Sequence, residues 1–149
     1  MTVKQKLYEL CVEFVNQRLQ TVESIVSSNQ KALQSETKSS AGDKHETGRA
    51  MLQLEMEKAG QQLQGIQKMK EILAKTNIEK ESTIAHLGSL VITNNTAYFL
   101  CISAGQFEVA HKKYFAVSVS SPIGKMLLGK KENDVFVFNG KQQIIEKVY

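Results

Sequence analysis

Two carboxylates spaced three residues apart, Asp43 and Glu46, are the strongest candidates for chemistry in this chain. They belong to the pentapeptide GDKHE at positions 42–46. On the first turn of a helix this spacing places both side chains on one side, within reach of a common metal ion or its water shell. Magnesium takes oxygen ligands and keeps several waters, so one or two carboxylates can recruit a weakly held ion. The same pair can instead cap a helix, with Asp43 at the N-cap and Glu46 three residues on.

Two long heptad-patterned segments flank this pair and are expected to carry it. The apolar seam of the first segment advances by four, three, four, three, four and seven residues: Tyr8, Val12, Val15, Leu19, Val22, Val26 and Leu33. The seam of the second segment comprises Leu52, Met56, Ala59, Leu63, Ile66 and Leu73, with Lys70 as an interruption. Two such seams joined by a short polar turn predict an antiparallel helical hairpin. Each arm would be about 50 Å long at a rise of 1.5 Å per residue.

The predicted hairpin spans residues 1–78, with its tip near residues 40–48. Gly42 is expected to end the first helix in a left-handed conformation. Apolar side chains also flank the first seam, and their extra packing would allow a weak homodimer. These flanking residues are Leu7, Leu10 and Phe14.

The sequence changes character near residue 80, where strand patterning replaces Gln-, Glu- and Lys-rich helical sequence without Pro. Apolar runs at 90–93 and 98–102 bracket an Asn-Asn-Thr turn, and a third strand is expected at 114–119. Residues 121–129 begin with Ser and the only Pro of the chain and end with Gly, which predicts a short helix.

A C-terminal β-hairpin completes this half of the chain. Asn139 and Gly140 separate two apolar segments, and both residues accept the positive φ of a type I′ turn. The predicted fold class is therefore α+β, in which an N-terminal helical hairpin precedes a small, mostly antiparallel β domain with one short helix at residues 79–149.

Composition narrows the class of protein. With 149 residues and a formal charge of +4, the chain is expected to form one or two small domains without a strongly basic nucleic-acid surface. No apolar run is long enough for a membrane span, and no secretory signal opens the sequence, so a cytoplasmic location without membrane contact is expected. Cys11 and Cys101 fall in different predicted domains, and we expect both to be reduced structural thiols.

The segment 120–131, SSPIGKMLLGKK, carries a family resemblance together with Asp134 and the hairpin after it. It resembles the C-terminal motif of the bacterial Gre (GreA/GreB) transcription elongation factors. In that family an antiparallel coiled coil precedes a domain of FKBP-like fold, and the order and size of both halves match here. The resemblance covers nearly the whole chain. The motif at 120–131 is fairly specific, whereas a coiled coil alone would be weak support.

The resemblance implies a function as an accessory factor rather than as an enzyme. Gre factors dock on RNA polymerase and insert the coiled coil into its secondary channel, where tip carboxylates help the polymerase hydrolyse the 3′ end of backtracked RNA. Asp43 and Glu46 match the tip pattern Gly-Asp-x-x-Glu and would assist the Mg²⁺ of the polymerase active centre. The chain itself would need no cofactor and hold no metal. Lys44 and Arg49 would lie near the nascent RNA.

The resemblance also implies which residues bind polymerase: Ser121, Pro122, Gly124, Lys125 and Lys130. Two departures from the family pattern stand out. The tip continues as Thr-Gly-Arg-Ala at 47–50, where the family has Asn followed by acidic and aromatic residues. Asn133 replaces a Gly before Asp134, and Asn tolerates the left-handed conformation.

Other interpretations remain open at this stage. A protein of the same shape could bind the secondary channel and modulate or inhibit transcription without cleavage, as the altered tip would allow. A coiled-coil hairpin with a β domain could also be a non-catalytic interaction module. Lys44 and Arg49 could simply form a solvated end, and Lys125 and Lys130 a soluble edge. The FKBP-like fold does not by itself imply prolyl isomerase activity.

Overall fold

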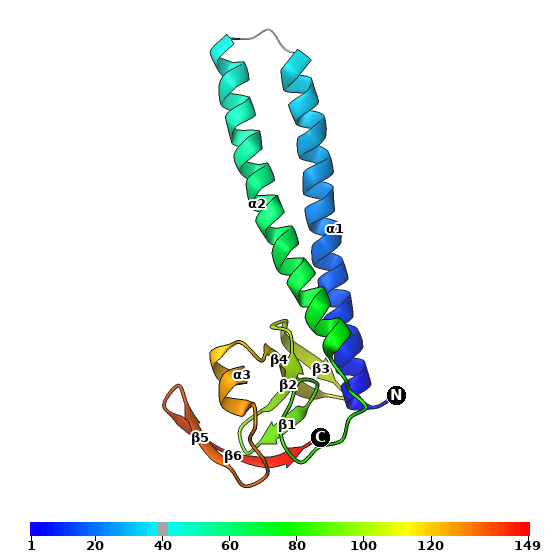
Figure 1. Cartoon of the computed structure of the whole chain (residues 1–149), viewed down its shortest axis with the longest axis vertical. Coiled ribbons are helices and arrows are strands. Elements are labelled where there is room, and N and C mark those ends of the chain that lie inside the picture. Colours follow the sequence, from blue (N-terminus) through cyan, green and yellow to red (C-terminus); the bar gives the residue numbers. More distant parts are fainter. Residues whose placement is uncertain (39–41) are drawn as a thin grey trace. The chain divides into compact units, whose positions relative to one another are not determined.

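A computed structural model describes the backbone of residues 1–38 and 42–149, and the side chains of residues 1–35 and 47–149. Two long helices, α1 (Val3–Lys38) and α2 (Gly42–Lys75), come first (Figure 1). The remaining elements, in chain order, are β1 (Leu90–Thr93), β2 (Ala97–Cys101), β3 (Gly105–Val109), β4 (Lys112–Ser118), α3 (Pro122–Leu127), β5 (Val135–Phe138) and β6 (Lys141–Val148). The predicted α+β class, a helical hairpin followed by a sheet with one short helix, is confirmed.

The chain divides into two compact units. One unit combines Met1–Phe14 with Glu71–Tyr149, and the other comprises Val15–Lys70. The first turns of α1 and the last turn of α2 thus belong to the same unit as the sheet. The predicted division between residues 78 and 79 follows the secondary structure instead.

The unit of residues 15–70 buries the predicted heptad seam. Val15, Val22, Ala59 and Ile66 are buried. The other predicted seam residues in this unit are partly buried: Leu19, Val26, Leu33, Leu52, Met56 and Leu63. Lys70 is exposed, as expected for a residue that interrupts the seam. The seam is therefore the packing face of both helices.

Asn29 occupies the step of seven between Val26 and Leu33. Its side chain is 7% exposed, and its amide nitrogen has no hydrogen-bond partner among the described residues. A polar residue inside an apolar seam lowers stability but helps to specify register. The heptad pattern therefore continues through this position with an amide in place of an aliphatic side chain.

Near its N-terminus, α1 buries a different face from the one predicted. Leu7 and Cys11 are completely buried, whereas Tyr8 and Val12 are only partly buried, so Leu7 is a core residue rather than a flanking one. The buried positions advance by four residues from Leu7 to Cys11 to Val15. Such spacing suits a straight helix that packs on a globular core, where no supercoil imposes the 3.5-residue period of a coiled coil.

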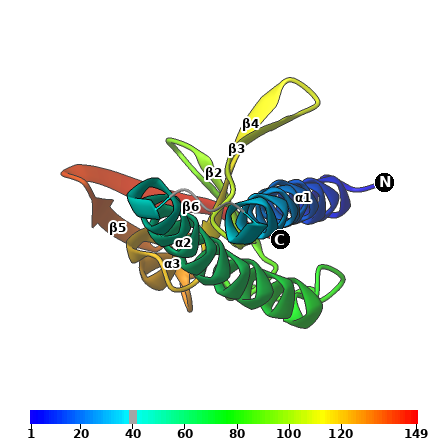
Figure 2. The same ribbon diagram turned by 90° about the horizontal axis from the view of Figure 1, so that it is seen from above.

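Six strands form one sheet in the order β3-β4-β2-β1-β6-β5. All pairs are antiparallel except β2 and β4, which run parallel from Tyr98↔Phe115 to Cys101↔Ser118. The β3–β4 and β5–β6 hairpins occupy the two ends of this order, and Figure 2 shows them pointing away from each other. Every residue of β2 is buried, as expected for a central strand covered on both faces.

Strand β3 is absent from the prediction. It pairs with β4 through a two-residue turn at Ala110 and His111, with φ values of 51° and 65°. Two successive positive φ angles define a type I′ turn, which normally selects Asn or Gly. Because Ala and His do not indicate such a turn, the sequence pattern gave no sign of this hairpin. The predicted turn at Asn139 and Gly140 is confirmed, with φ values of 52° and 75°.

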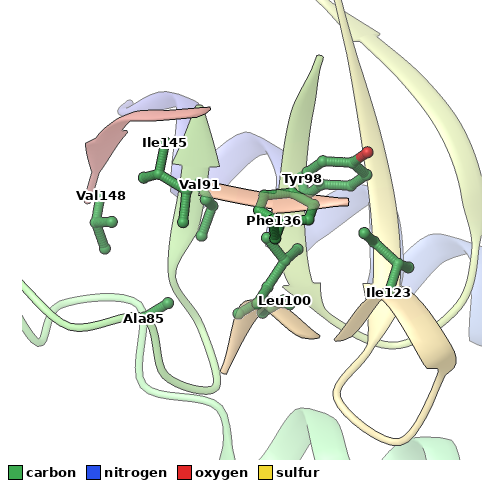
Figure 3. Packing of buried hydrophobic residues seen from close by; sticks show 9 residues of the cluster. Ala85, Val91, Tyr98, Leu100, Ile123, Phe136, Ile145 and Val148 are labelled. Atoms are coloured by element: carbon green, nitrogen blue, oxygen red, sulfur yellow. The ribbon is translucent and has the colours of Figure 1, made fainter. Parts of the chain in front are cut away.

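One face of the sheet packs against α3 to form the main apolar core (Figure 3). Its buried members are Ala85, Val91, Tyr98, Leu100, Ile123, Leu127, Phe136, Ile145 and Val148. Ile123 and Leu127 come from α3, and Phe136 comes from β5. Burying nine mostly large apolar side chains stabilises this unit, since each large aliphatic or aromatic group contributes about 1.5–3 kcal/mol.

Candidate functional site

The two candidate carboxylates belong to the first turn of α2, which begins at Gly42. The prediction that Gly42 ends the first helix is wrong, because α1 ends at Lys38 and Gly42 is the first residue of α2. Gly is acceptable there because helix N-termini tolerate it better than helix interiors. The side chains of Asp43, Lys44 and Glu46 lie outside the described residues, so their predicted roles stay predictions.

The residues just after this turn are described. Arg49 is exposed, and Gly48 is partly buried. Gly48 precedes Leu52 and Met56 by four and eight residues, so it continues the seam toward the start of α2. A Gly at this seam position removes apolar contacts and weakens the helix by roughly 1 kcal/mol relative to Ala. The start of α2 therefore has a thinner apolar seam than the rest of the hairpin.

Ser121 organises the start of α3. Its hydroxyl accepts a hydrogen bond from the Gly124 N–H at 3.1 Å and donates one to the Ser118 carbonyl at 2.6 Å. Pro122 follows at the first helical position, where its missing N–H leaves no donor unsatisfied. Ser121 therefore joins the end of β4 to α3, and its side chain is already used by the fold.

Gly124 is required by close packing. A Cβ atom at this position would lie 1.9 Å from the Ser118 carbonyl oxygen and 2.9 Å from the Val119 Cα atom. No side chain fits there unless the backbone moves. Among the five predicted polymerase-binding residues, Ser121 and Gly124 thus hold α3 in place, whereas Pro122 and Lys125 are exposed and Lys130 is partly exposed.

The outward side of α3 combines basic and apolar groups. Met126 and Leu128 are 38% and 39% exposed, beside the exposed Lys125. Sequence analysis missed both residues because an apolar run in a short helix is normally assigned to the core. Together with Pro122 and Lys125, they define what we call the α3 surface.

A second exposed apolar area lies on the β5–β6 hairpin. Val135 and Val137 are 50% and 54% exposed, and Ile144, which pairs with Val135 across the strands, is 40% exposed. These side chains project from the face opposite Phe136, which is buried in the core. The sequence does contain a signal, because β5 reads VFVF without the polar alternation of a half-exposed strand.

The turn before β5 explains the end of the motif. Asn133 adopts the left-handed conformation, with φ 72°, as expected for an Asn in place of Gly. The carboxylate of Asp134 accepts a hydrogen bond from the Lys131 N–H at 2.9 Å and closes the turn. Asp134 is thus a structural residue, and Lys131 remains exposed.

The two cysteines meet in the interior, contrary to their assignment to different domains. Both are free thiols, as expected, and both are completely buried within the same compact unit. Cys11 on α1 and Cys101 at the end of β2 are close enough that each thiol shifts the pKa of the other. The reason is that the first turns of α1 belong to the same compact unit as β2, which the sequence pattern did not reveal.

Within the described ranges, no cluster of three or more His, Cys, Asp or Glu side chains could hold a metal ion. None of the helices, over the residues described, is long and apolar enough to cross a membrane. Comparison with family models, with curated proteins and with solved structures gave no match to this chain.

Proposed function

We propose that this chain is a Gre-like factor that binds RNA polymerase and stimulates cleavage of backtracked RNA. The observation that carries the proposal is the position of Asp43 and Glu46 in the first turn of α2, directly after the polar connection between the two long helices. A second support is the SSPIGKMLLGKK segment, whose Ser, Pro and first Gly build α3. Both features belong to the resemblance on which the proposal depends.

Asp43 and Glu46 would act on a metal site whose main ligands belong to the polymerase. Hydrolysis of a phosphodiester by two metal ions needs both ions held and a water positioned for in-line attack. Two carboxylates three residues apart can add oxygen ligands or orient that water. Arg49 is exposed one turn further on and would contact RNA phosphates, as would Lys44. The isolated chain would therefore bind magnesium weakly and cleave nothing.

The C-terminal unit would supply the docking contact, and the α3 surface is its best candidate. Exposed apolar groups next to a basic side chain are typical of protein interfaces rather than of bare surface. In this proposal Lys125 and Lys130 provide electrostatic attraction, and Met126 and Leu128 provide apolar burial. Ser121 and Gly124 contribute indirectly because they fix the position of α3.

The test is RNA shortening in a backtracked elongation complex. The wild-type chain should shorten the RNA, and Asp43→Asn or Glu46→Gln should reduce the rate by about 10²-fold or more, as expected when a group that acts on the reacting phosphate is lost. Glu55→Gln, an exposed carboxylate further along α2, is the matched control and should cleave at the wild-type rate. Full activity in both tip variants would refute the cleavage role.

Docking is tested separately by a binding measurement. Met126→Ala together with Lys125→Ala should weaken binding to polymerase about tenfold or more, since exposed apolar anchors contribute 1 kcal/mol or more each. Lys112→Ala, an exposed lysine on β4, is the control. Unchanged affinity in the α3 variant would show that another surface docks.

A non-cleaving modulator of transcription is the second candidate. The observation in its favour is the Thr-Gly-Arg-Ala sequence at 47–50, which lacks the acidic and aromatic residues of the family tip. Slower elongation without RNA shortening would support it. A chain that binds no polymerase at all would instead be an interaction module.

A further inference from the structure

The buried thiols of Cys11 and Cys101 form a reactive cluster, among the residues with described side chains, that the proposed function does not use. Cys11 lies on α1 and Cys101 at the end of β2, and neither side chain is exposed to solvent. Each of the two thiols shifts the pKa of the other, and the Thr76 hydroxyl lies 3.6 Å from the Cys101 sulfur. Three segments far apart in the sequence thus meet at these sulfur atoms.

Thr76, which follows α2, ties this cluster to the end of that helix. Its hydroxyl donates to the Ile72 carbonyl at 2.7 Å and lies 3.6 Å from the Cys101 sulfur. Tyr8, one turn before Cys11 on α1, donates to the Leu73 carbonyl at 2.9 Å. The first turns of α1, the end of α2 and the end of β2 are therefore packed together around the two thiols.

The two thiols differ in acidity. The neighbouring Cys11 thiol stabilises a thiolate at Cys101 and lowers the pKa of Cys101, although burial opposes this effect. The interaction with Cys101, together with burial, raises the pKa of Cys11. The thiolate is the nucleophile in oxidation, so Cys101 would react first and Cys11 would follow as the resolving thiol.

We propose that Cys11 and Cys101 form a reversible intrachain disulfide in response to hydrogen peroxide. The Cys101 thiolate attacks one peroxide oxygen, the O–O bond breaks, and hydroxide leaves and takes up a proton to form water. Cys101 is then a sulfenic acid. The Cys11 sulfur attacks the Cys101 sulfur, the S–O bond breaks, and a second water leaves with the proton of Cys11. Two thiols and one peroxide thus yield one disulfide and two waters.

The crosslink would tie the first turns of α1 to the central strand of the sheet. It closes a loop of about 90 residues, and such loops restrict the unfolded chain strongly. Because both sulfurs are buried, the peroxide must enter during local opening of the first turns of α1, and oxidation should be slow. The reduced and oxidised forms would therefore differ in how firmly this end of α1 is held.

The experiment uses the full chain, treated with hydrogen peroxide under native conditions. Peptide mapping without reductant should show a Cys11–Cys101 linked pair that disappears with dithiothreitol. The oxidised chain should unfold at a temperature higher by on the order of 10 °C. A crosslink between two chains, or sulfinic acid at Cys101 with Cys11 still free, would overturn the proposal.

Single-cysteine variants separate the two roles. In Cys11→Ser the Cys101 sulfenic acid should accumulate and react with dimedone, whereas Cys101→Ser should react much more slowly. Cys11→Ala is the alternative should serine destabilise the fold. Equal dimedone labelling of both single-cysteine variants would contradict the assigned order of attack. None of these measurements involves RNA polymerase. A negative result would therefore refute the disulfide without affecting the proposed function, and loss of the proposed function would leave the disulfide untouched.

Discussion

Replacement of Gly124 by Ala tests how the resemblance motif shapes the fold. The added Cβ atom would lie 1.9 Å from the Ser118 carbonyl oxygen, and this separation must grow by about 1.1 Å to reach the 3.0 Å that real contacts respect. The clash is with backbone, so the start of α3 must move away from the end of β4. Such a shift would also break the Ser121 cap. We expect a loss of about 3–4 kcal/mol from overpacking and the lost cap together.

The assay exploits the distribution of tyrosines. The chain has four Tyr and no Trp, and Tyr8, Tyr98, Tyr114 and Tyr149 all belong to the unit that contains the sheet. Tyrosine fluorescence therefore follows that unit alone, whereas circular dichroism at 222 nm mainly follows the long helices. A loss of about 3 kcal/mol should lower the melting temperature of the fluorescence transition by roughly 12–24 °C.

Gly65→Ala is the matched control. Gly65 lies in α2, and apart from its chain neighbours and the backbone of its own helix turn, its added Cβ would have no atom within 4 Å. The same substitution should there stabilise the helix by about 0.5–1 kcal/mol, because Gly loses more backbone entropy on folding than Ala. Gly124→Ala should thus lower the midpoint of the fluorescence transition, whereas Gly65→Ala should raise the midpoint of the transition followed at 222 nm. A Gly124→Ala protein that melts with the wild-type midpoint would refute the close-packing argument.

Three further perturbations have defined outcomes. Ser121→Ala should lower the stability of the sheet unit by about 1–2 kcal/mol in a urea titration followed by tyrosine fluorescence, whereas Ser120→Ala should change it by less than about 0.5 kcal/mol. Asn29→Leu should raise the free energy of unfolding of the long helices, followed by circular dichroism at 222 nm, by about 1 kcal/mol. The reason is that it removes a buried amide nitrogen without a hydrogen-bond partner among the described residues. A lower unfolding midpoint would contradict this. Burial, with the nearby thiols, raises the pKa of Tyr8, whose hydroxyl donates to the Leu73 carbonyl at 2.9 Å. The folded state thus favours the neutral phenol, so this stabilisation should be complete below about pH 10 and fall at higher pH; Tyr8→Phe should lose the hydrogen bond, about 1 kcal/mol, and show a smaller alkaline decline in unfolding free energy.

Patterns with a local physical cause were predicted correctly. The heptad seam identified Val15, Val22, Ala59 and Ile66 as buried, because apolar periodicity alone determines which side of a long helix packs. Ser, Pro and Gly at the ends of 121–129 located α3, since capping is a short-range property. The turn at Asn139 and Gly140 followed from the positive φ that both residues accept.

The candidate site was predictable only in part. The sequence identified the carboxylates, and the backbone places them in the first turn of α2. The sequence did not indicate that Ser121 forms hydrogen bonds within the fold or that Gly124 packs tightly against Ser118 and Val119. It also did not indicate that Met126 and Leu128 are exposed. These properties depend on how α3 lies against β4, which involves residues that no local pattern relates.

Local sequence patterns are enough to specify the long amphipathic helices, the capped turns and the short apolar strands, because each depends on interactions within a few residues. The strand order, the parallel pairing of β2 with β4 and the proximity of Cys11 to Cys101 across about 90 residues arise only when the chain folds. Such contacts depend on which surfaces become buried together when the whole chain packs. The free energy of that packing is a property of the assembled unit and leaves no periodic trace in the sequence.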